Sequence, residues 1–173
     1  MIFIMLCSLF VKAQSASGNN ARSLKANFSV PALLAYQETA KTKIRDFYQY
    51  LELLSDASLS KQLKEEVKLN ILSLFKNKDV MVKDITSNEL NDIQLPLLLS
   101  RLAAGPSLNL KIGSINDQSI EQNSWLITYS VKVVGGAKEN DFKLTQRIYL
   151  IKNSKTFGAN SKDVWQLFLG ETQ

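Results

Sequence analysis

The pattern of apolar residues changes near Gly105, and this change limits the folds open to the chain more than any other feature. After Gly105, apolar and polar residues alternate, which is typical of β-strands that bury one face. The segments that show this alternation are 107–112, 124–134, 141–151 and 163–169. We therefore expect four strands in antiparallel succession, with a hairpin loop at 135–140 and a longer loop at 152–162.

Before Gly105, apolar residues recur at spacings of three and four, which indicates amphipathic helices. The first helix is expected to begin near Ser29 and Pro31 and to end at 55–58, and the second to follow a cap at Ser58 or Ser60. Their apolar stripes are Ile44, Phe47, Tyr48, Leu51 and Leu54, and then Leu63, Val67, Ile71, Leu74 and Phe75.

Two shorter elements are expected between the second helix and Gly105. The segment 80–85, "VMVKDI", is short and β-branched and predicts a strand. Pro96 fits only the first turn of a helix, so a third helix is expected near 95–103. The order is thus helix, helix, strand, helix and four strands. It predicts an α+β fold with N-terminal helices packed on an antiparallel sheet.

Alternation also assigns the two faces of the sheet, because successive side chains of a strand point to opposite sides. The face expected to meet the helices carries Trp125, Ile127, Tyr129, Val131, Val133, Phe142, Leu144, Gln146, Ile148, Leu150, Trp165, Leu167 and Leu169. The opposite face is a mixture of polar and apolar side chains.

The element order and the closing "VWQLFLGE" resemble the nuclear transport factor 2-like (cystatin-like) superfamily, which includes ketosteroid isomerase and scytalone dehydratase. The resemblance covers residues 30–173. It implies a cone, in which a curved sheet wraps around a long first helix and often leaves a pocket at the wide end. No catalytic motif accompanies it, so it implies a fold and no particular activity.

The N-terminal "MIFIMLCSLFVKAQ" resembles a secretory signal. Its apolar run is shorter than the roughly 20 residues that span a bilayer, and Val11 and Ala13 suit signal peptidase. We expect a signal peptide at 1–13, a flexible leader at 14–28 and a single domain at 29–173, with no transmembrane anchor after cleavage. The junction after Ala13 resembles those of Bacteroidetes envelope proteins, which implies a periplasmic or secreted protein.

The composition excludes several kinds of chemistry. The chain has no histidine, and its one cysteine, Cys7, lies in the predicted signal. A processed chain could form no disulfide, no zinc or copper site built on His or Cys, no Cys nucleophile and no Ser-His-Asp triad. We expect no cofactor. The formal charge of +5 comes from bases scattered among acids, which argues against nucleic-acid binding.

A ligand site on the inward face is one prediction. Gln146 is the one polar residue there, and Tyr48, Trp125, Tyr129 and Trp165 could line a pocket for an apolar or amphipathic molecule. The alternative is that the aromatic residues are core. Gln146 would then pair with a loop or helix end, or a bulge would turn it outward.

The outward face and Asp84 carry the other predictions. Superfamily members commonly dimerise through the outward face, which here holds Thr128, Thr145, Tyr149, Gln166 and Phe168; the alternative is an ordinary mixed surface. Asp84 is the one acid inside a predicted strand. It could be a base facing a cavity, or it could cap the next segment.

Three functions follow from these predictions. The first is an exported, non-catalytic module that binds a small molecule. The second is an interaction or scaffold subunit of an envelope assembly, and the third is a histidine-free lyase or isomerase. A pocket with a buried carboxylate would favour the enzyme, a polar-lined cavity without one the binding module, and a filled cone the scaffold.

Overall fold

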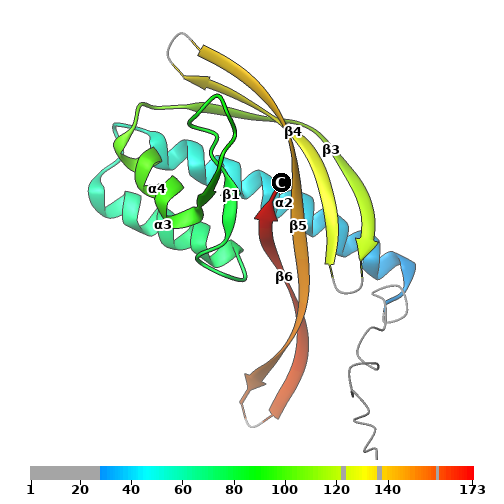
Figure 1. The fold of residues 1–173 in the computed structure, drawn as a ribbon. Coiled ribbons are helices and arrows are strands. Elements are labelled where there is room, and N and C mark those ends of the chain that lie inside the picture. The colour runs from blue at the N-terminus through cyan, green and yellow to red at the C-terminus, as the bar shows by residue number, and fades with distance from the viewer. Residues whose placement is uncertain (1–27, 122–123, 136–137, 159) are drawn as a thin grey trace, which may run out of the picture.

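The computed structural model describes residues 28–121, 124–135, 138–158 and 160–173 and shows the predicted α+β class. Three helices pack with a four-stranded antiparallel sheet, and a two-stranded sheet lies beside them (Figure 1). The signal peptide predicted at 1–13 lies outside the described residues. Of the leader predicted at 14–28, only Phe28 is described.

The helices begin where the sequence predicts. Helix α2 (Val30–Ser55) is capped by the Ser29 hydroxyl, which accepts a hydrogen bond from the Ala32 amide at 3.4 Å. Ser60 caps α3 (Lys61–Leu74) in the same way. Helix α4 (Leu95–Ala104) has its proline in the first turn, where no intrahelical donor is needed.

Helix α2 lies across the sheet and supports the other two helices. It contacts β3 and β6 of the sheet as well as α3 and α4. Its buried face is the predicted stripe, completed by Ala40 and Ser55. The stripe predicted for α3 is wrong at Leu63, which is 47% exposed.

The main sheet is a meander in the order β3-β4-β5-β6, as predicted. Its strands are β3 (Asn109–Glu121), β4 (Ser124–Gly135), β5 (Lys138–Phe157) and β6 (Asn160–Thr172). The face predicted to meet the helices is buried, except that Trp165 is half-buried. The alternation therefore assigned the two faces correctly.

The loop predicted at 152–162 is wrong. Strands β5 and β6 stay paired as far as Phe157 and Asn160, and Gly158 provides the positive φ of the turn. Strand β4 ends its pairing with β5 at Tyr149, so the rest of the hairpin is a two-stranded ribbon that projects from the molecule (Figure 1). Most of its side chains are exposed on both faces, and so it lacks the alternation of a half-buried strand.

The other boundaries differ less. Pairing of β4 with β5 continues to Gly135 and Lys138, inside the hairpin loop predicted at 135–140. The strand predicted at 80–85 is reduced to β1 (Met81–Lys83). It pairs with β2 (Asp92–Gln94), which was not predicted because a three-residue strand shows too little alternation to detect.

Candidate functional site

The inward face of the sheet holds a buried chain of hydrogen bonds, which we call the tyrosine–glutamine network. Its members are Tyr48, Tyr129, Gln146 and Thr172. The two phenol oxygens are 3.1 Å apart, and the Tyr129 hydroxyl donates to Gln146 Oε1 at 3.3 Å. Thr172 donates to the same oxygen at 2.9 Å. Gln146 is fully buried, so these bonds replace the water that its amide loses on folding.

A β-bulge in β6 explains why a glutamine stands at this position. Gln146 pairs with Thr172 and Ile148 with Leu169, so β6 has an extra residue in this stretch. Gln146 Nε2 donates to the Gly170 carbonyl at 2.7 Å and to the Glu171 carbonyl at 3.3 Å. The side chain thus pairs with carbonyl groups in the bulged stretch of β6, and it points inward, so its partners are neither a loop nor a helix end.

Burial raises the pKa of both the Tyr48 and Tyr129 phenols above the ordinary value of 10.0. Both side chains are therefore neutral at physiological pH and act as hydrogen-bonding groups. Trp125 is buried on the same face, and its Nε1 has no hydrogen-bond partner among the described residues. The inward face is filled by side chains at this point.

Trp165 lies apart from this network. It packs edge-to-face against Phe28, with ring centroids 5.1 Å apart, and Phe28 packs in the same way against Tyr36 near the start of α2. Of the five residues predicted to bind a ligand, the structure therefore joins Tyr48, Tyr129 and Gln146 by hydrogen bonds and places Trp165 at the other end of the helix.

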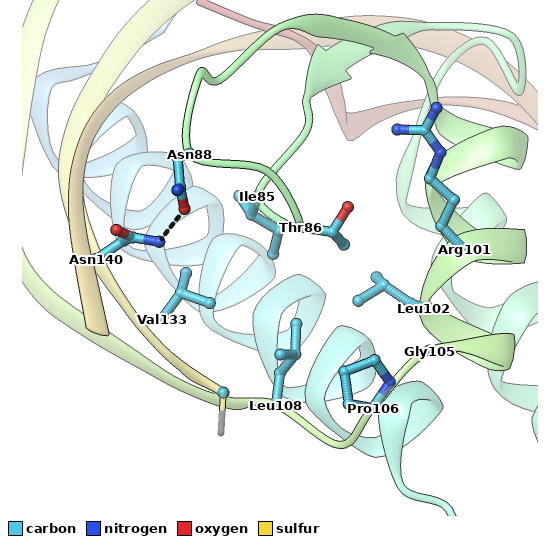
Figure 2. A pocket seen from close by; sticks show the side chains of 11 residues that line it. Ile85, Thr86, Asn88, Arg101, Leu102, Gly105, Pro106, Leu108, Val133 and Asn140 are labelled. Carbon is cyan, nitrogen blue, oxygen red and sulfur yellow. Dashed lines mark hydrogen bonds between the residues drawn. The ribbon is translucent and has the colours of Figure 1, made fainter. Parts of the chain in front are cut away.

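A pocket of about 380 Å³ lies elsewhere, between the C-terminal end of α4, the β1–β2 loop (84–91) and the β4–β5 end of the sheet (Figure 2). We call it the α4 pocket. Its lining residues are Ile85, Thr86, Asn88, Arg101, Leu102, Gly105, Pro106, Leu108, Val133, Gly135 and Asn140. None of the residues predicted to bind a ligand lines it.

Two polar groupings stand on opposite sides of the α4 pocket (Figure 2). On one side, Asn140 Nδ2 donates to Asn88 Oδ1 at 3.2 Å. On the other, Arg101 Nη1 forms an ion pair with Asp84, which does not itself line this pocket. Between them, Leu102, Pro106, Leu108 and Val133 provide an apolar floor.

Asp84 organises the loop above this pocket. Its side chain is 3% exposed, and Oδ1 accepts hydrogen bonds from the Thr86 amide, at 3.0 Å, and from the Thr86 hydroxyl, while Oδ2 pairs with Arg101. Of the two interpretations of Asp84, the structure shows the capping role. A carboxylate held by three donors is a poor general base, because those donors occupy lone pairs that would otherwise accept a substrate proton.

The outward face of the sheet carries polar contacts of its own. The Thr128 and Thr145 hydroxyls are 3.0 Å apart, and Thr128 is 5% exposed. Tyr149 donates to Glu171 at 3.1 Å and has the Lys76 ammonium over its ring. Gln166, which accepts from Asn153, and Phe168 are half-buried. The dimer interface predicted from these five residues remains a prediction, with little surface available at Thr128.

Comparison with models of known protein families finds no match, and comparison with curated proteins finds none either. Within the described residues, no three acidic, histidine or cysteine side chains gather where they could hold a metal ion. The described helices include none with both the length and the apolarity needed to cross a membrane.

Sequence reasoning missed the α4 pocket because its walls come from loops and element ends. Asn88 and Asn140 lie in polar segments without periodicity, 52 residues apart in the sequence. Gly105 and Pro106 were recognised only as the end of a helix. No signal in the sequence places these four residues around one space.

Proposed function

We propose that this protein is an exported, non-catalytic module that binds a small molecule in the α4 pocket. The pocket itself is the observation that carries the proposal. Its volume of about 380 Å³ falls in the range of about 300–1,000 Å³ that is usual for small-molecule sites. It also has their usual composition, an apolar floor with a few polar groups at the edge.

The packing of the inward face supports placing the ligand in the α4 pocket. Tyr48, Tyr129 and Gln146 satisfy one another, and Trp125 and Ile127 are among the largest fully buried side chains beside them. A ligand there would have to displace core side chains. In the α4 pocket it would need to displace none of the residues that line it.

The groups available for chemistry support a non-catalytic role. The lining of the α4 pocket contains no carboxylate, and the nearby Asp84 is held by Thr86 and Arg101. The buried tyrosines have raised pKa values and stay protonated. General acid–base catalysis needs a group that exchanges protons near the working pH.

We also propose that the chain belongs to the nuclear transport factor 2-like superfamily and works in the periplasm or outside the cell. The order of the described elements is the one expected for a cone. The long helix α2 comes first, the short β1–β2 pair and α4 come later, and the meander of four strands comes last. The proposed location is supported by the N-terminal "MIFIMLCSLFVKAQ".

Native mass spectrometry of the protein purified from the cells that make it would test the binding function. We expect a small-mass adduct on the wild type, and its loss in Leu108→Trp, which fills the floor of the α4 pocket. Leu59→Trp is the matched control, because Leu59 is also half-buried but lines a different groove, between α3 and α4. A bare wild type, or an adduct that survives Leu108→Trp, would refute the proposal.

An interaction subunit is the second candidate. The observation in its favour is the β5–β6 ribbon, which projects beyond the sheet next to the half-buried Gln166 and Phe168 (Figure 1). In the same spectra, this function would appear as a dimer or as a complex with another protein, without a small adduct. Phe168→Glu would then dissociate the complex if the outward face forms the interface.

A further inference from the structure

We infer that the ligand of the α4 pocket is an uncharged amphipathic molecule with a group that both donates and accepts hydrogen bonds. The inference rests on the proposed function and adds the chemical class of the ligand. It follows from the charges around the pocket, from the hydrogen-bonding capacity left on the asparagine side, and from the apolar floor.

The charge of the pocket is already balanced. Arg101 is the one ionisable residue in the lining, and its partner Asp84 is buried. An anionic ligand that drew Arg101 away would leave the buried Asp84 carboxylate with Thr86 alone, and a buried charge that loses its counter-charge is strongly unfavourable. A cationic ligand would meet Arg101 and would find both Asp84 oxygens occupied. An uncharged ligand avoids both costs.

The asparagine pair keeps part of its hydrogen-bonding capacity. A side-chain amide has two N–H donors and one oxygen with two lone pairs. The bond from Asn140 Nδ2 to Asn88 Oδ1 leaves the Asn140 oxygen and the Asn88 amino group unused within the described chain. An acceptor and a donor thus stand side by side, which suits a hydroxyl or an amide on the ligand.

The rest of the ligand should be apolar. Ile85, Leu102, Pro106, Leu108 and Val133 form a continuous apolar surface beside the asparagine pair (Figure 2). Gly135 keeps this floor in place, because a Cβ there would lie 2.5 Å from Leu108 Cδ2 and would push that side chain aside. The polar part of the ligand would therefore lie at Asn88 and Asn140, with its apolar part over Leu108.

A pair of fluorescent probes tests the inference on the full-length protein. N-phenyl-1-naphthylamine is uncharged and carries one N–H group. 1-Anilinonaphthalene-8-sulfonate has the same aromatic skeleton and an added sulfonate. Both are titrated with direct excitation of the probe, so that tryptophan does not contribute. We expect the uncharged probe to bind at least tenfold more tightly, although the protein is basic and should attract the sulfonate.

A substitution at Asp84 tests whether charge decides which probe binds. Asp84→Asn leaves Arg101 without its counter-charge, so we expect sulfonate binding to tighten at least tenfold, with the uncharged probe changed less than threefold. Asp92→Asn is the control, because Asp92 pairs with Lys83 on the surface and does not line the α4 pocket. If Asp84→Asn does not fold, the salt dependence of the wild type is measured instead. Raising NaCl from 50 to 500 mM should change the affinity for the uncharged probe by less than twofold.

The outcomes separate the two proposals. If neither probe binds, or if both bind Leu108→Trp as well as they bind the wild type, the α4 pocket is no binding site and the proposed function fails. If the sulfonate binds as tightly as the uncharged probe and Leu108→Trp abolishes both, the site stands but the ligand class is wrong. A strong salt dependence of the uncharged probe would also overturn the charge argument.

Discussion

Gln146 and Asn140 are two amides on the same strand, and they lie in opposite kinds of environment. Gln146 is buried, and both ends of its amide are engaged by Tyr129, Thr172 and the carbonyl groups of the β6 bulge. Asn140 stands at the edge of the α4 pocket, and its side chain makes one hydrogen bond within the described part of the chain, to Asn88. The buried amide on an apolar face is thus part of the internal structure, while the amide with unused capacity lies beside the space where we propose that a ligand binds.

The two regions also differ in what holds them. The tyrosine–glutamine network joins α2, β4, β5 and β6 inside the core. The asparagine side of the α4 pocket is joined by a single exposed hydrogen bond between a loop and a strand. Changes in the first region should appear as lost stability, and changes in the second as altered binding.

Gln146→Leu should have the largest effect on stability. It removes the partner of the Gly170 carbonyl and of the Tyr129 and Thr172 hydroxyls, and each buried group left unpaired costs about 1–3 kcal/mol. Because part of this cost is relieved by rearrangement, we expect the free energy of unfolding to fall by about 3 kcal/mol. Urea denaturation followed by circular dichroism measures it.

Gln49→Leu is the matched control for this change. Gln49 lies exposed on α2, so its loss should change the free energy of unfolding by less than about 0.5 kcal/mol. Equal effects of the two substitutions would mean that the network adds nothing beyond an ordinary surface contact.

Alkaline pH should weaken the inward face next. Tyr48 and Tyr129 have folded-state pKa values above the ordinary 10.0, so above that pH the unfolded chain releases protons that the folded chain keeps. Their contribution is complete below about pH 10 and is lost as the pH rises further. Each tyrosine should lower the free energy of unfolding by about 1.4 kcal/mol per pH unit in that window.

Urea denaturation at a series of pH values from 9 to 12 measures this slope, with the Tyr48→Phe, Tyr129→Phe double variant as the reference. The variant should show a shallower loss, because it lacks the two buried phenols. Identical slopes would show that the buried phenols do not keep their protons.

Asn140→Ala should have the smallest effect on stability and a visible effect on binding. Its hydrogen bond to Asn88 is exposed, so the free energy of unfolding should fall by less than about 0.5 kcal/mol. Affinity for N-phenyl-1-naphthylamine should fall by about fivefold, the equivalent of one hydrogen bond. Asn70→Ala, on the exposed face of α3, is the control and should change neither quantity. If Asn140→Ala binds the probe as tightly as the wild type does, the asparagine pair is not part of the binding site.

Much of the fold could be predicted, because periodicity records which face of an element is buried. The stripe of α2 and the alternation of β4 matched their buried faces closely. The β5–β6 ribbon was missed because most of its side chains are exposed, so neither face is marked by apolar residues. Where both faces of a strand meet water, as at Ser154 and Lys155, no alternation remains to be read.

The arrangement of polar groups was harder to predict. Alternation correctly placed Gln146 inward, but its partners depend on a one-residue bulge between Leu169 and Thr172, which sequence patterns do not register. The α4 pocket depends on how the 84–91 loop meets the start of β5. That geometry is set by the side-chain bonds of Asp84, each specific to the folded chain.

The contacts at the β6 bulge also affect when the protein can fold during its synthesis. Ribosomes make α2 first, yet the Tyr48 phenol is linked to Thr172 through two side chains of the intervening strands. Contacts so distant in sequence form slowly, because a long loop must close before they return any free energy. Until β6 is synthesised, the nascent chain has an apolar α2 face and an unsatisfied Gln146, the kind of surface that chaperones protect.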